Sequence, residues 1–365
     1  MKSYQDKVST YSELYHKTNK KYNSISLLRL LSIFLLLFFM FYYIKTNEIL
    51  YVIFAVLSFA GFIILMRIHS RLSFQKLLAE TLLKINQNEI SFLKKEKTPF
   101  ENGAEFIDFH HPYAYDLDIF GEHSLFQSLN RTASYIGKKT LADLLLHNLS
   151  EAAILENQEA VNELKNKVDW RQEFQALAII SEDSKTSYEA IKHWTAFKNN
   201  ALPKVLTALS IILPTMFFGT LAAYFITSKT ILLSYLTYIF IANLVVLGRS
   251  IKRIQSEIAK ADNIDKIIKQ YSLLLEKIEK ESFQSKKLIH LQEQLVFKNA
   301  KASMHLKQLS ELFSRMDTIS NFVTATLFNG TFLFNLHVLR ALLKWKENYA
   351  SEIDNWISII GEIVA

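Results

Sequence analysis

Residues 30–66 read LLSIFLLLFFMFYYIKTNEILYVIFAVLSFAGFIILM, and this stretch decides the fold of the chain. It holds two apolar runs, Leu30–Ile44 and Ile49–Met66, with only a short polar link between them. A helix needs ~20 apolar residues to cross a bilayer, and the first run gains this length back to Ser26 if Arg29 snorkels to the interface. A cleaved signal peptide would begin earlier, and no second run would follow it so soon. The stretch therefore predicts a transmembrane helical hairpin.

The same pattern returns later in the chain. Val205–Ile226, interrupted only by Pro214 and Gly219, and Ile231–Leu247 are again apolar and of spanning length. No Asp, Glu, Lys or Arg lies in the middle of any of the four runs. Ionisable residues at depth are the usual mark of ion paths and proton relays, so their absence argues against a transporter or channel. We expect two hairpins that act as anchors.

The flanking charges predict an orientation. Each hairpin tip carries one lysine, Lys45 or Lys229, whereas the opposite ends of the spans are rich in Lys and Arg. The positive-inside rule then puts both termini and residues 67–200 in the cytoplasm, in a multi-pass protein of the cell inner (cytoplasmic) membrane. The cations at the predicted cytoplasmic ends are Lys17, Lys20, Lys21, Arg29, Arg67, Arg71, Lys76, Lys198, Lys204, Arg249, Lys252 and Arg253.

A fifth apolar stretch, Ile319–Leu343, is interrupted by polar residues. Amide and charged groups are costly in hydrocarbon, so a buried helix in a soluble bundle is favoured over a fifth span, which stays as the alternative. The interrupting residues are Asn321, Asn329, Asn335, His337 and Arg340.

Composition points to an all-α protein. Among 365 residues, half of them hydrophobic, only 8 Gly and 4 Pro are present, and few turn-formers favour long helices. The absence of Cys excludes disulfides, thiolate nucleophiles and Cys-ligated metals, and it fits a reducing compartment. A net charge of +7 fits an anionic partner, lipid or nucleic acid, but it equally fits the positive-inside excess of a membrane protein.

Between the spans the pattern becomes that of helices in water. Ser70–Lys94 continues inward from the second span, 95–115 reads as a loop, and Ser150 is placed to cap a helix that begins at Glu151. One long amphipathic helix is marked by Ile251, Ile254, Ile258, Ile264, Ile267, Ile268, Tyr271, Leu274 and Ile278. The predicted segments are 1–25 (cytoplasmic N-terminus), 26–66 (hairpin), 67–115 (helix and loop), 116–200 (first helical part), 201–248 (hairpin) and 249–365 (long helices).

One stretch carries a specific motif. Asp116–Leu149 reads DLDIFGEHSLFQSLNRTASYIGKKTLADLLLHNL, and Asn157–Val161 of the next helix reads NQEAV. These resemble the start of the core domain of MutS-type mismatch-repair ATPases, where S-L-x-x-x-L-(D/N)-x-T precedes x-G-(R/K)-(R/K)-x-L-x-x-(W/L)-L. The matching positions are Ser124, Leu125, Leu129, Asn130, Thr132, Gly137, Lys138, Lys139, Leu141 and Leu145.

The resemblance covers roughly residues 100–200 and 250–365 and implies a helical core with long lever helices. It implies DNA as a ligand, and ATP and Mg²⁺ only for an ATPase domain that would follow the core and would also form a homodimer. We expect the motif residues to be structural: the leucines pack a core, Gly137 allows close helix approach, and Thr132 bonds within a turn.

Several family features are missing. A hairpin stands where the mismatch-reading domain would precede the core, and the inserted-aromatic string G-x-F-Y-E is absent, so Phe120–Glu122 is interpreted as structural. The strand-rich clamp has no room, because Asn299–Tyr349 reads as a helical pair. No G-x-x-x-x-G-K-(S/T) phosphate loop occurs, and Gly137–Thr140 is only the nearest string. We therefore expect a fragment of a longer protein, and no ATP binding by this chain alone.

Candidate ligand sites are few. Lys and Arg outnumber Asp and Glu after the fourth span, which fits either a solvated helix face or weak contact with DNA phosphates. Asp108, His110 and His111 are interpreted as loop hydrogen-bonding residues rather than metal ligands, and we predict no catalytic, cofactor or metal site. The alternative to a DNA role is a membrane-anchored helical scaffold for other proteins. The candidate DNA contacts are Lys286, Lys287, Lys298, Lys301 and Lys307.

Overall fold

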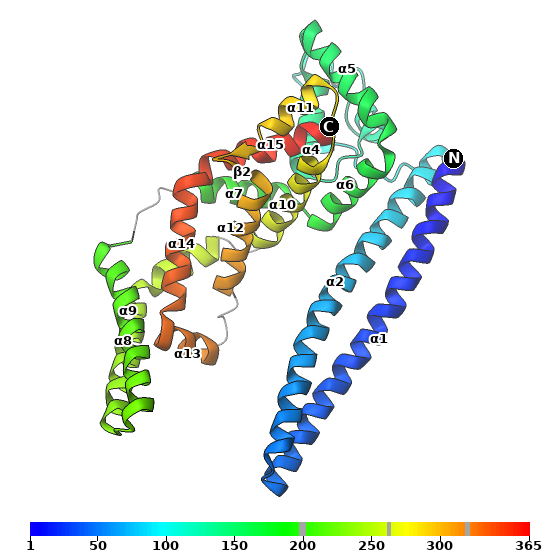
Figure 1. Cartoon of the computed structure of the whole chain (residues 1–365). Helices are drawn as coiled ribbons and strands as arrows, with labels where there is room; N and C mark the ends of the chain where they lie inside the picture. The colour runs from blue at the N-terminus through cyan, green and yellow to red at the C-terminus, as the bar shows by residue number, and fades with distance from the viewer. Residues whose placement is uncertain (197–201, 261–263, 318–321) are drawn as a thin grey trace. The chain divides into compact units, whose positions relative to one another are not determined.

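The computed structural model describes residues 1–196, 202–260, 264–317 and 322–365, and these are almost entirely helical (Figure 1). The predicted all-α class is confirmed. Within the described residues one small antiparallel pair of strands occurs, β1 (Val296–Phe297) with β2 (Ala300–Lys301), which the sequence analysis missed. Two compact units are present, one made of residues 1–130 and 167–180, the other of 131–166 and 181–365.

These units cut across the predicted segments. The predicted helical part 116–200 is divided: residues 116–130 and 167–180 pack with the N-terminal helices, while 131–166 and the residues from 181 onward belong to the second unit. The reason is a helix within 167–180 whose apolar face is covered by the helix that precedes the loop 95–115, a contact that local periodicity cannot reveal.

The first unit is dominated by two very long helices, α1 (Lys2–Thr46) and α2 (Ile49–Leu93), which pack along each other. At 1.5 Å per residue, 45 residues extend about 68 Å, more than twice the ~30 Å hydrocarbon core of a bilayer. The predicted helical continuation of the second apolar run over 70–94 is confirmed, because α2 is continuous to Leu93. The N-terminal segment 1–25 belongs to the same continuous helix as the first apolar run.

Four helices are long and apolar enough to cross a membrane: α1, α2, α8 (Lys204–Thr227) and α9 (Ile231–Lys260). Their apolar windows are almost uncovered by the rest of the chain, with 6% to 17% of each buried. Large side chains such as Phe34 and Leu57 are about 60% exposed. These surfaces need a cover that the described residues do not supply.

The rest of the first unit comprises η1 (Ala104–Phe106), α3 (Leu125–Leu129) and α6 (Val168–Ser181). Phe106, Phe120 and Phe126 form an aromatic cluster in which ring centroids lie 5.4–6.0 Å apart. Gly103, at φ +67°, lies so close that a Cβ there would be 2.6 Å from the Phe126 ring. Because Phe120 is buried in this cluster, the structural interpretation of Phe120–Glu122 is confirmed.

The expected burial of the two motif leucines in α3 is wrong. Leu125 and Leu129 are 45% and 51% exposed, whereas Phe126 is completely buried. A helix of five residues can bury only one side, and that side carries Phe126 and Gln127. The Phe126 ring, which has the larger apolar surface, occupies the buried position that the leucine pattern predicted for Leu125 and Leu129.

The second unit holds the remaining helices. Its bounds are α4 (Tyr135–Leu146), α5 (Glu151–Asn166), α7 (Lys185–Ala196), α8, α9, α10 (Ile264–Lys280), α11 (Lys286–Glu293), α12 (Ala302–Asp317), α13 (Phe322–Phe332), α14 (Phe334–Tyr349), η2 (Ala350–Glu352) and α15 (Ile353–Val364). Ser150 Oγ accepts a hydrogen bond from the Ala153 N–H at 3.3 Å, so the predicted cap before Glu151 is confirmed.

The core of this unit lies where α10 and α12 pack together and α7 and α14 contribute tryptophans. Trp194 of α7 is buried against Phe313 of α12 and Trp345 of α14. The predicted amphipathic face is confirmed over α10, where the residues at helical spacing are buried. Residues 261–263, which the prediction placed inside one long helix, and the Ile258 side chain lie outside the described residues.

The predicted fifth helix is two helices. Residues 319–321 lie outside the described part of the chain, and a break at Leu333, at φ +49°, separates α13 from α14. Asn329 makes the break possible, because its side-chain oxygen accepts the Asn335 N–H at 2.9 Å at the start of α14. α13 packs on α9 and α8 rather than inside a bundle.

Replacing Phe126 by Ala should remove about 3–5 kcal/mol from the free energy of unfolding, because it empties a fully buried aromatic position. Leu129→Asp, on the half-exposed side of the same short helix, should change it by only about 0.5 kcal/mol. Denaturant unfolding of the detergent-solubilised protein measures both. A larger loss for Leu129→Asp than for Phe126→Ala would mean that the leucine, not the aromatic ring, is in the core.

Candidate functional site

The motif helix α4 is fixed at its N-terminus from two sides. Ser134 Oγ accepts the Gly137 N–H at 3.1 Å, and Asp183 Oδ2 accepts the Tyr135 N–H at 2.9 Å. Burial raises the pKa of the Asp183 carboxyl, although the nearby Tyr271 hydroxyl and the backbone N–H groups of Tyr135 and Ser184 oppose the shift. Burial and the adjacent Asp183 together raise the pKa of Tyr271. The buried Asp183 carboxyl therefore holds the first turn of α4 in place.

Two glycines bring α4 and the C-terminal helix α15 close together. A Cβ on Gly361 would lie 2.8 Å from Thr140 Oγ1 and 3.0 Å from Ile136 Cγ1. A Cβ on Gly137 would lie 3.3 Å from Val364 Cγ1. The close helix approach predicted for Gly137 is therefore confirmed. On the same helix Leu141 is buried and Leu145 is half-buried, as expected of core positions.

Polar contacts join α5 to the segment before α11. The Glu163 carboxylate accepts the backbone N–H groups of Gln284, at 3.0 Å, and Ser285, at 2.7 Å. Lys287 Nζ donates to Asn157 Oδ1 at 2.7 Å and lies 3.5 Å from Glu362 of α15. Asn157 opens the NQEAV string, so this part of the motif is used to hold α11 and α15 to α5.

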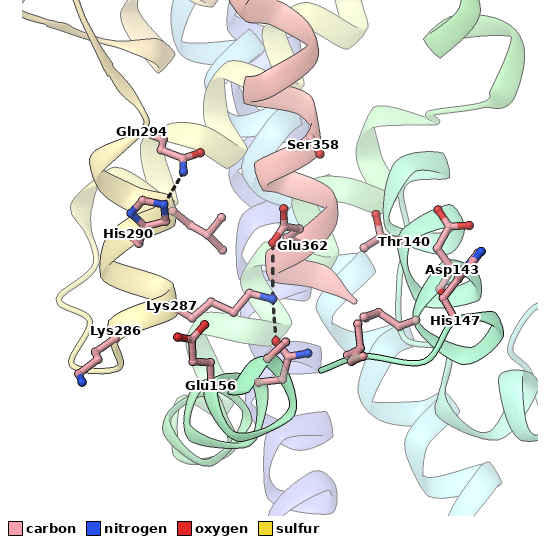
Figure 2. Close-up of a pocket in the computed structure, with 15 residues that line it drawn as sticks. Thr140, Asp143, His147, Glu156, Lys286, Lys287, His290, Gln294, Ser358 and Glu362 are labelled. Carbon is pink, nitrogen blue, oxygen red and sulfur yellow. Dashed lines mark hydrogen bonds and ion pairs between the residues drawn. The ribbon is translucent and has the colours of Figure 1, made fainter. Parts of the chain in front are cut away.

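A groove of about 1020 Å³ lies between α4, α5, α11 and α15 (Figure 2). Figure 2 shows Lys287 in its centre, with dashed contacts to Glu362 and toward α5. The remaining charged and titratable lining residues are Asp143, His147, Glu156, Lys286 and His290. His290 Nε2 and Gln294 Nε2 are 2.8 Å apart on one wall. The groove thus offers hydrogen-bond donors and acceptors and charged groups of both signs.

The groove carries charges of both signs and a central ion pair. Within the described residues no group of three or more His, Asp or Glu is arranged to hold a metal ion. Lys287, the most central cation, already pairs with Glu362. Three carboxyl groups and two lysines give no excess of positive charge, so the groove suits a polar chain with both donors and acceptors more than a polyanion.

The predicted DNA-contact lysines are spread over several elements. Lys286 and Lys287 begin α11, Lys298 lies in the turn between β1 and β2, Lys301 belongs to β2, and Lys307 is on α12. All are exposed except Lys287, whose side chain is 24% exposed. Lys298 Nζ donates to Asn348 Oδ1 at 3.1 Å and lies over the ring of Tyr349.

The other motif residues divide between the units. In the first unit Ser124 Oγ accepts the Gln127 N–H at 3.1 Å and so caps α3, and Asn130 Nδ2 donates to the Glu101 carbonyl oxygen at 3.2 Å. In the second unit the Thr132 Cβ would lie 3.2 Å from a Cβ on Gly137, and Lys138 acts electrostatically on Asp183. These contacts bear on the local structure, and the bond predicted for Thr132 within a turn stays a prediction.

Of the loop residues predicted to form hydrogen bonds, Asp108 and His111 do so through their side chains, whereas the His110 side chain is 98% exposed. The backbone N–H of His110 donates to Asp108 Oδ1 at 2.9 Å. The ring nitrogen His111 Nδ1 accepts from the backbone N–H groups of Tyr113 and Ala114. These contacts shape the loop.

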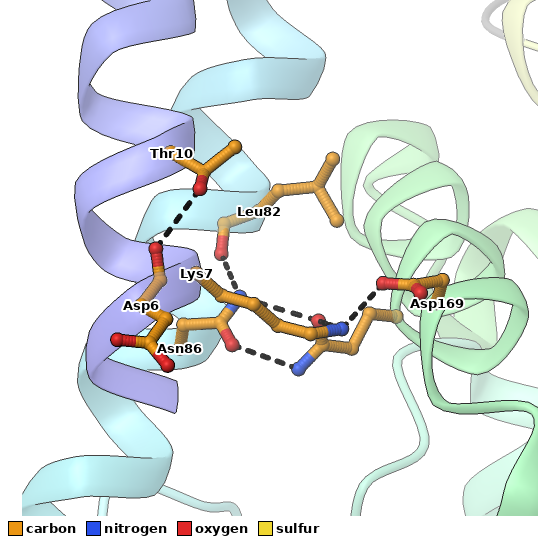
Figure 3. Close-up of polar contacts among 7 residues, drawn as sticks. Asp6, Lys7, Thr10, Leu82, Asn86 and Asp169 are labelled. Carbon is orange, nitrogen blue, oxygen red and sulfur yellow. Dashed lines mark hydrogen bonds and ion pairs between the residues drawn. The ribbon is translucent and has the colours of Figure 1, made fainter. Parts of the chain in front are cut away.

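Sequence reasoning missed a polar joint in the first unit, shown in Figure 3. Asn86 of α2 and Gln172 of α6 are buried and exchange amide hydrogen bonds of 2.9 Å and 3.3 Å. Lys7 of α1 donates to Gln172 Oε1 at 3.1 Å and pairs with Asp169 at 2.5 Å. The local signal for this joint in the sequence was Asn86, an amide on the otherwise apolar face of the long helix α2.

No family model matches this sequence, and no curated protein and no solved structure shows significant similarity to it.

Lys287→Met should lower the free energy of unfolding by about 1–2 kcal/mol, because Asn157 and Glu362 lose a charged hydrogen-bond partner inside the groove. Its neighbour Lys286 provides a matched control, since it is exposed and Lys286→Met should be nearly neutral. Thermal unfolding of both variants under identical detergent conditions compares them. Equal effects would show that the groove contacts of Lys287 contribute nothing to stability.

Proposed function

We propose that this chain is a multi-pass protein of the cytoplasmic membrane, anchored by α1 with α2 and by α8 with α9, with its helical units in the cytoplasm. The observation that carries this proposal is the exposed apolar surface of the four helices, of which 6% to 17% is covered by the chain. Soluble proteins rarely expose an apolar patch of more than a few hundred Å². Lipid is the cover that fits such long apolar surfaces.

The orientation follows from the charges at the helix ends. The links at Asn47 and Ser228 lie beside one lysine each, whereas the other ends of the spans carry clusters of Lys and Arg. A cytoplasmic side at the cationic ends leaves the two links outside. Both termini and the two helical units then share the cytoplasm.

Single cysteines test this topology cleanly, because the chain has none of its own. With a membrane-impermeant thiol reagent added to intact cells or sealed right-side-out vesicles, Asn47→Cys and Ser228→Cys should be labelled. Ser3→Cys and Ser351→Cys should react only after the membrane is permeabilised; all four positions are exposed on the protein. Labelling of Ser351→Cys from outside would contradict the proposed topology.

We further propose that this membrane-anchored chain has a MutS-like role. It carries a helical core similar to that of MutS-type proteins, and its ligand is DNA. The support is the resemblance in residues 116–149 together with the close packing of Gly137 on the end of α15. An ATPase domain, with ATP, Mg²⁺ and a homodimer interface, is implied by the family and would lie outside these residues.

The DNA contacts proposed are the exposed lysines Lys286, Lys298, Lys301 and Lys307. Lys287 contributes less, because Asn157 and Glu362 already engage it. Contact with phosphates alone gives affinity without base readout, so mismatched and matched duplexes should bind alike. Lysines near the bilayer are attracted to anionic lipid instead, at about 1 kcal/mol each.

Titrating DNA at several salt concentrations tests this role. Four phosphate contacts give a slope of log affinity against log salt of about −3.6, and Lys307→Gln should make it shallower by about 0.9. Lys280→Gln is the control, since Lys280 is exposed but already pairs with Glu276 in the same helix. A clear preference for mismatched duplex, or equal slopes for both variants, would contradict the proposed contacts.

The groove favours a second candidate, a membrane-anchored scaffold for other proteins. Its mixed lining, with Asp143, Glu156 and Glu362 beside the lysines, repels phosphate chains and suits a polypeptide segment. Absence of any salt-dependent DNA binding by the whole chain would select the scaffold over the MutS-like role.

A further inference from the structure

Helix α13 has its apolar side turned outward. Val323 is 72% exposed and Leu327 56%, and Phe328 and Phe332 are 43% and 46% exposed. Val323 and Leu327, like Phe328 and Phe332, are four residues apart, and at about 3.6 residues per turn the four side chains occupy half of the helix circumference. A helix on the surface of a water-soluble domain shows the opposite pattern, with its apolar side inward.

The inward side of α13 is small and polar. Gly330 lies against Phe240 of α9, where a Cβ would be 2.1 Å from the ring. Asn243 of α9 is fully buried, and its Nδ2 donates to the Gly330 carbonyl oxygen at 2.8 Å. Asn329, beside Gly330, is also buried. Small residues at the contact and amides that bond between helices are the features of helix packing within membranes.

Several polar groups near the end of α13 have partners within the protein, whereas the buried oxygens Asn243 Oδ1 and Asn335 Oδ1 have none among the described residues. Thr331 Oγ1 donates to the Leu327 carbonyl oxygen at 2.7 Å, and Asn329 Nδ2 donates to that of Ala325 at 2.7 Å. At the break, the Asn335 N–H is taken by Asn329 Oδ1. Irregular backbone is tolerated at membrane depth only where such partners exist, and here they do.

The level of α13 along the spans is set by its contacts. The Phe332 ring packs at a tilt against that of Phe218 of α8, with ring centroids 4.8 Å apart, and Gly330 faces Phe240. Phe240 precedes Arg249 by nine positions, about 13 Å along a helix. The break at Leu333 precedes Arg340, the next charged residue of the chain, by about 10 Å. Both distances fall within the ~15 Å half-thickness of the hydrocarbon core.

We propose that α13 is a fifth membrane-embedded helix, which enters the cytoplasmic half of the bilayer beside α8 and α9 without crossing it. Its outer side, Val323, Leu327, Phe328 and Phe332, contacts lipid acyl chains. The proposal rests on the proposed function, which puts α8 and α9 in the bilayer. Lipid is the occupant because this surface continues that of the spans, where Ile241 and Tyr238 are similarly exposed.

Spin labels on single cysteines measure the depth of this helix in lipid nanodiscs. Leu327→Cys is compared with Ile241→Cys on α9 and Met304→Cys on α12, three positions that are 51% to 61% exposed. Oxygen concentrates in the bilayer and a water-soluble nickel chelate is excluded from it. The ratio of oxygen to nickel collisions at Leu327 should therefore match that at Ile241 and exceed that at Met304 several-fold.

A water-like ratio at Leu327 with a lipid-like ratio at Ile241 would overturn this inference and leave the membrane anchor intact. Water-like ratios at both positions would overturn the two together. Low collision rates with both reagents at Leu327 alone would mean that a second protein surface, such as another copy of the chain, covers the helix, which also contradicts contact with lipid.

A packing variant provides an independent check of the same depth. Gly330→Leu should force α13 away from Phe240 and lower the oxygen-to-nickel ratio at Leu327→Cys. Gly219→Leu is the matched control, because a Cβ at Gly219 meets open space, and it should leave the ratio unchanged. An unchanged ratio in both variants would show that the Gly330 contact does not hold α13 in the bilayer.

Discussion

The apolar surface of four long helices is larger than the chain itself can cover, and this constraint governs the rest of the structure. Removing apolar area from water is worth roughly 25 cal/mol per Å², so surfaces as long as α1 and α2 require lipid or a protein partner. Where water is excluded, polar groups must find partners within the protein. The hydrogen bonds from Asn243 Nδ2 to the Gly330 carbonyl oxygen and from the Asn335 N–H to Asn329 Oδ1 meet part of that demand.

Each compact unit contains one pair of these helices, and each pair is tied to its own unit by polar contacts. In the first unit, Lys7, Asn86 and Gln172 join α1, α2 and α6 through hydrogen bonds that are largely shielded from water. In the second, the His337 ring nitrogen Nε2 lies 2.8 Å from the Ser210 carbonyl oxygen and links α14 to α8. Apolar side chains slide past one another easily, whereas such directional bonds define one register. Anchor and folded part are therefore continuous within each unit.

The sequence was informative where local patterns decide structure. The four apolar runs, the cap at Ser150, the close approach at Gly137 and the buried face of α10 were all predicted from spacing and residue type. The sequence pattern gave the wrong prediction for the short helix α3, where only one face can be buried. Phe126 is buried there, rather than Leu125 or Leu129. The break at Leu333 depends on a side chain four residues earlier, which no periodicity records.

The groove was beyond sequence reasoning for a different reason. Its walls come from α4, α5, α11 and α15, and the contact of Lys287 with Asn157 joins positions 130 residues apart. Lys287 was predicted to face a ligand, yet it is held by Glu362 and Asn157. Charge runs in a sequence show which side chains are cationic but not which of them a neighbouring helix has already paired.

Extraction of membranes at alkaline pH tests the central claim, that this is an integral membrane protein, most directly. Carbonate at about pH 11 strips proteins held by charge or by surface contact, whereas helices that cross the hydrocarbon core remain. The chain should stay entirely with the sedimented membranes and should enter the supernatant only after detergent is added. Release of the chain by carbonate alone would show that its apolar helices are covered by protein and do not cross the bilayer.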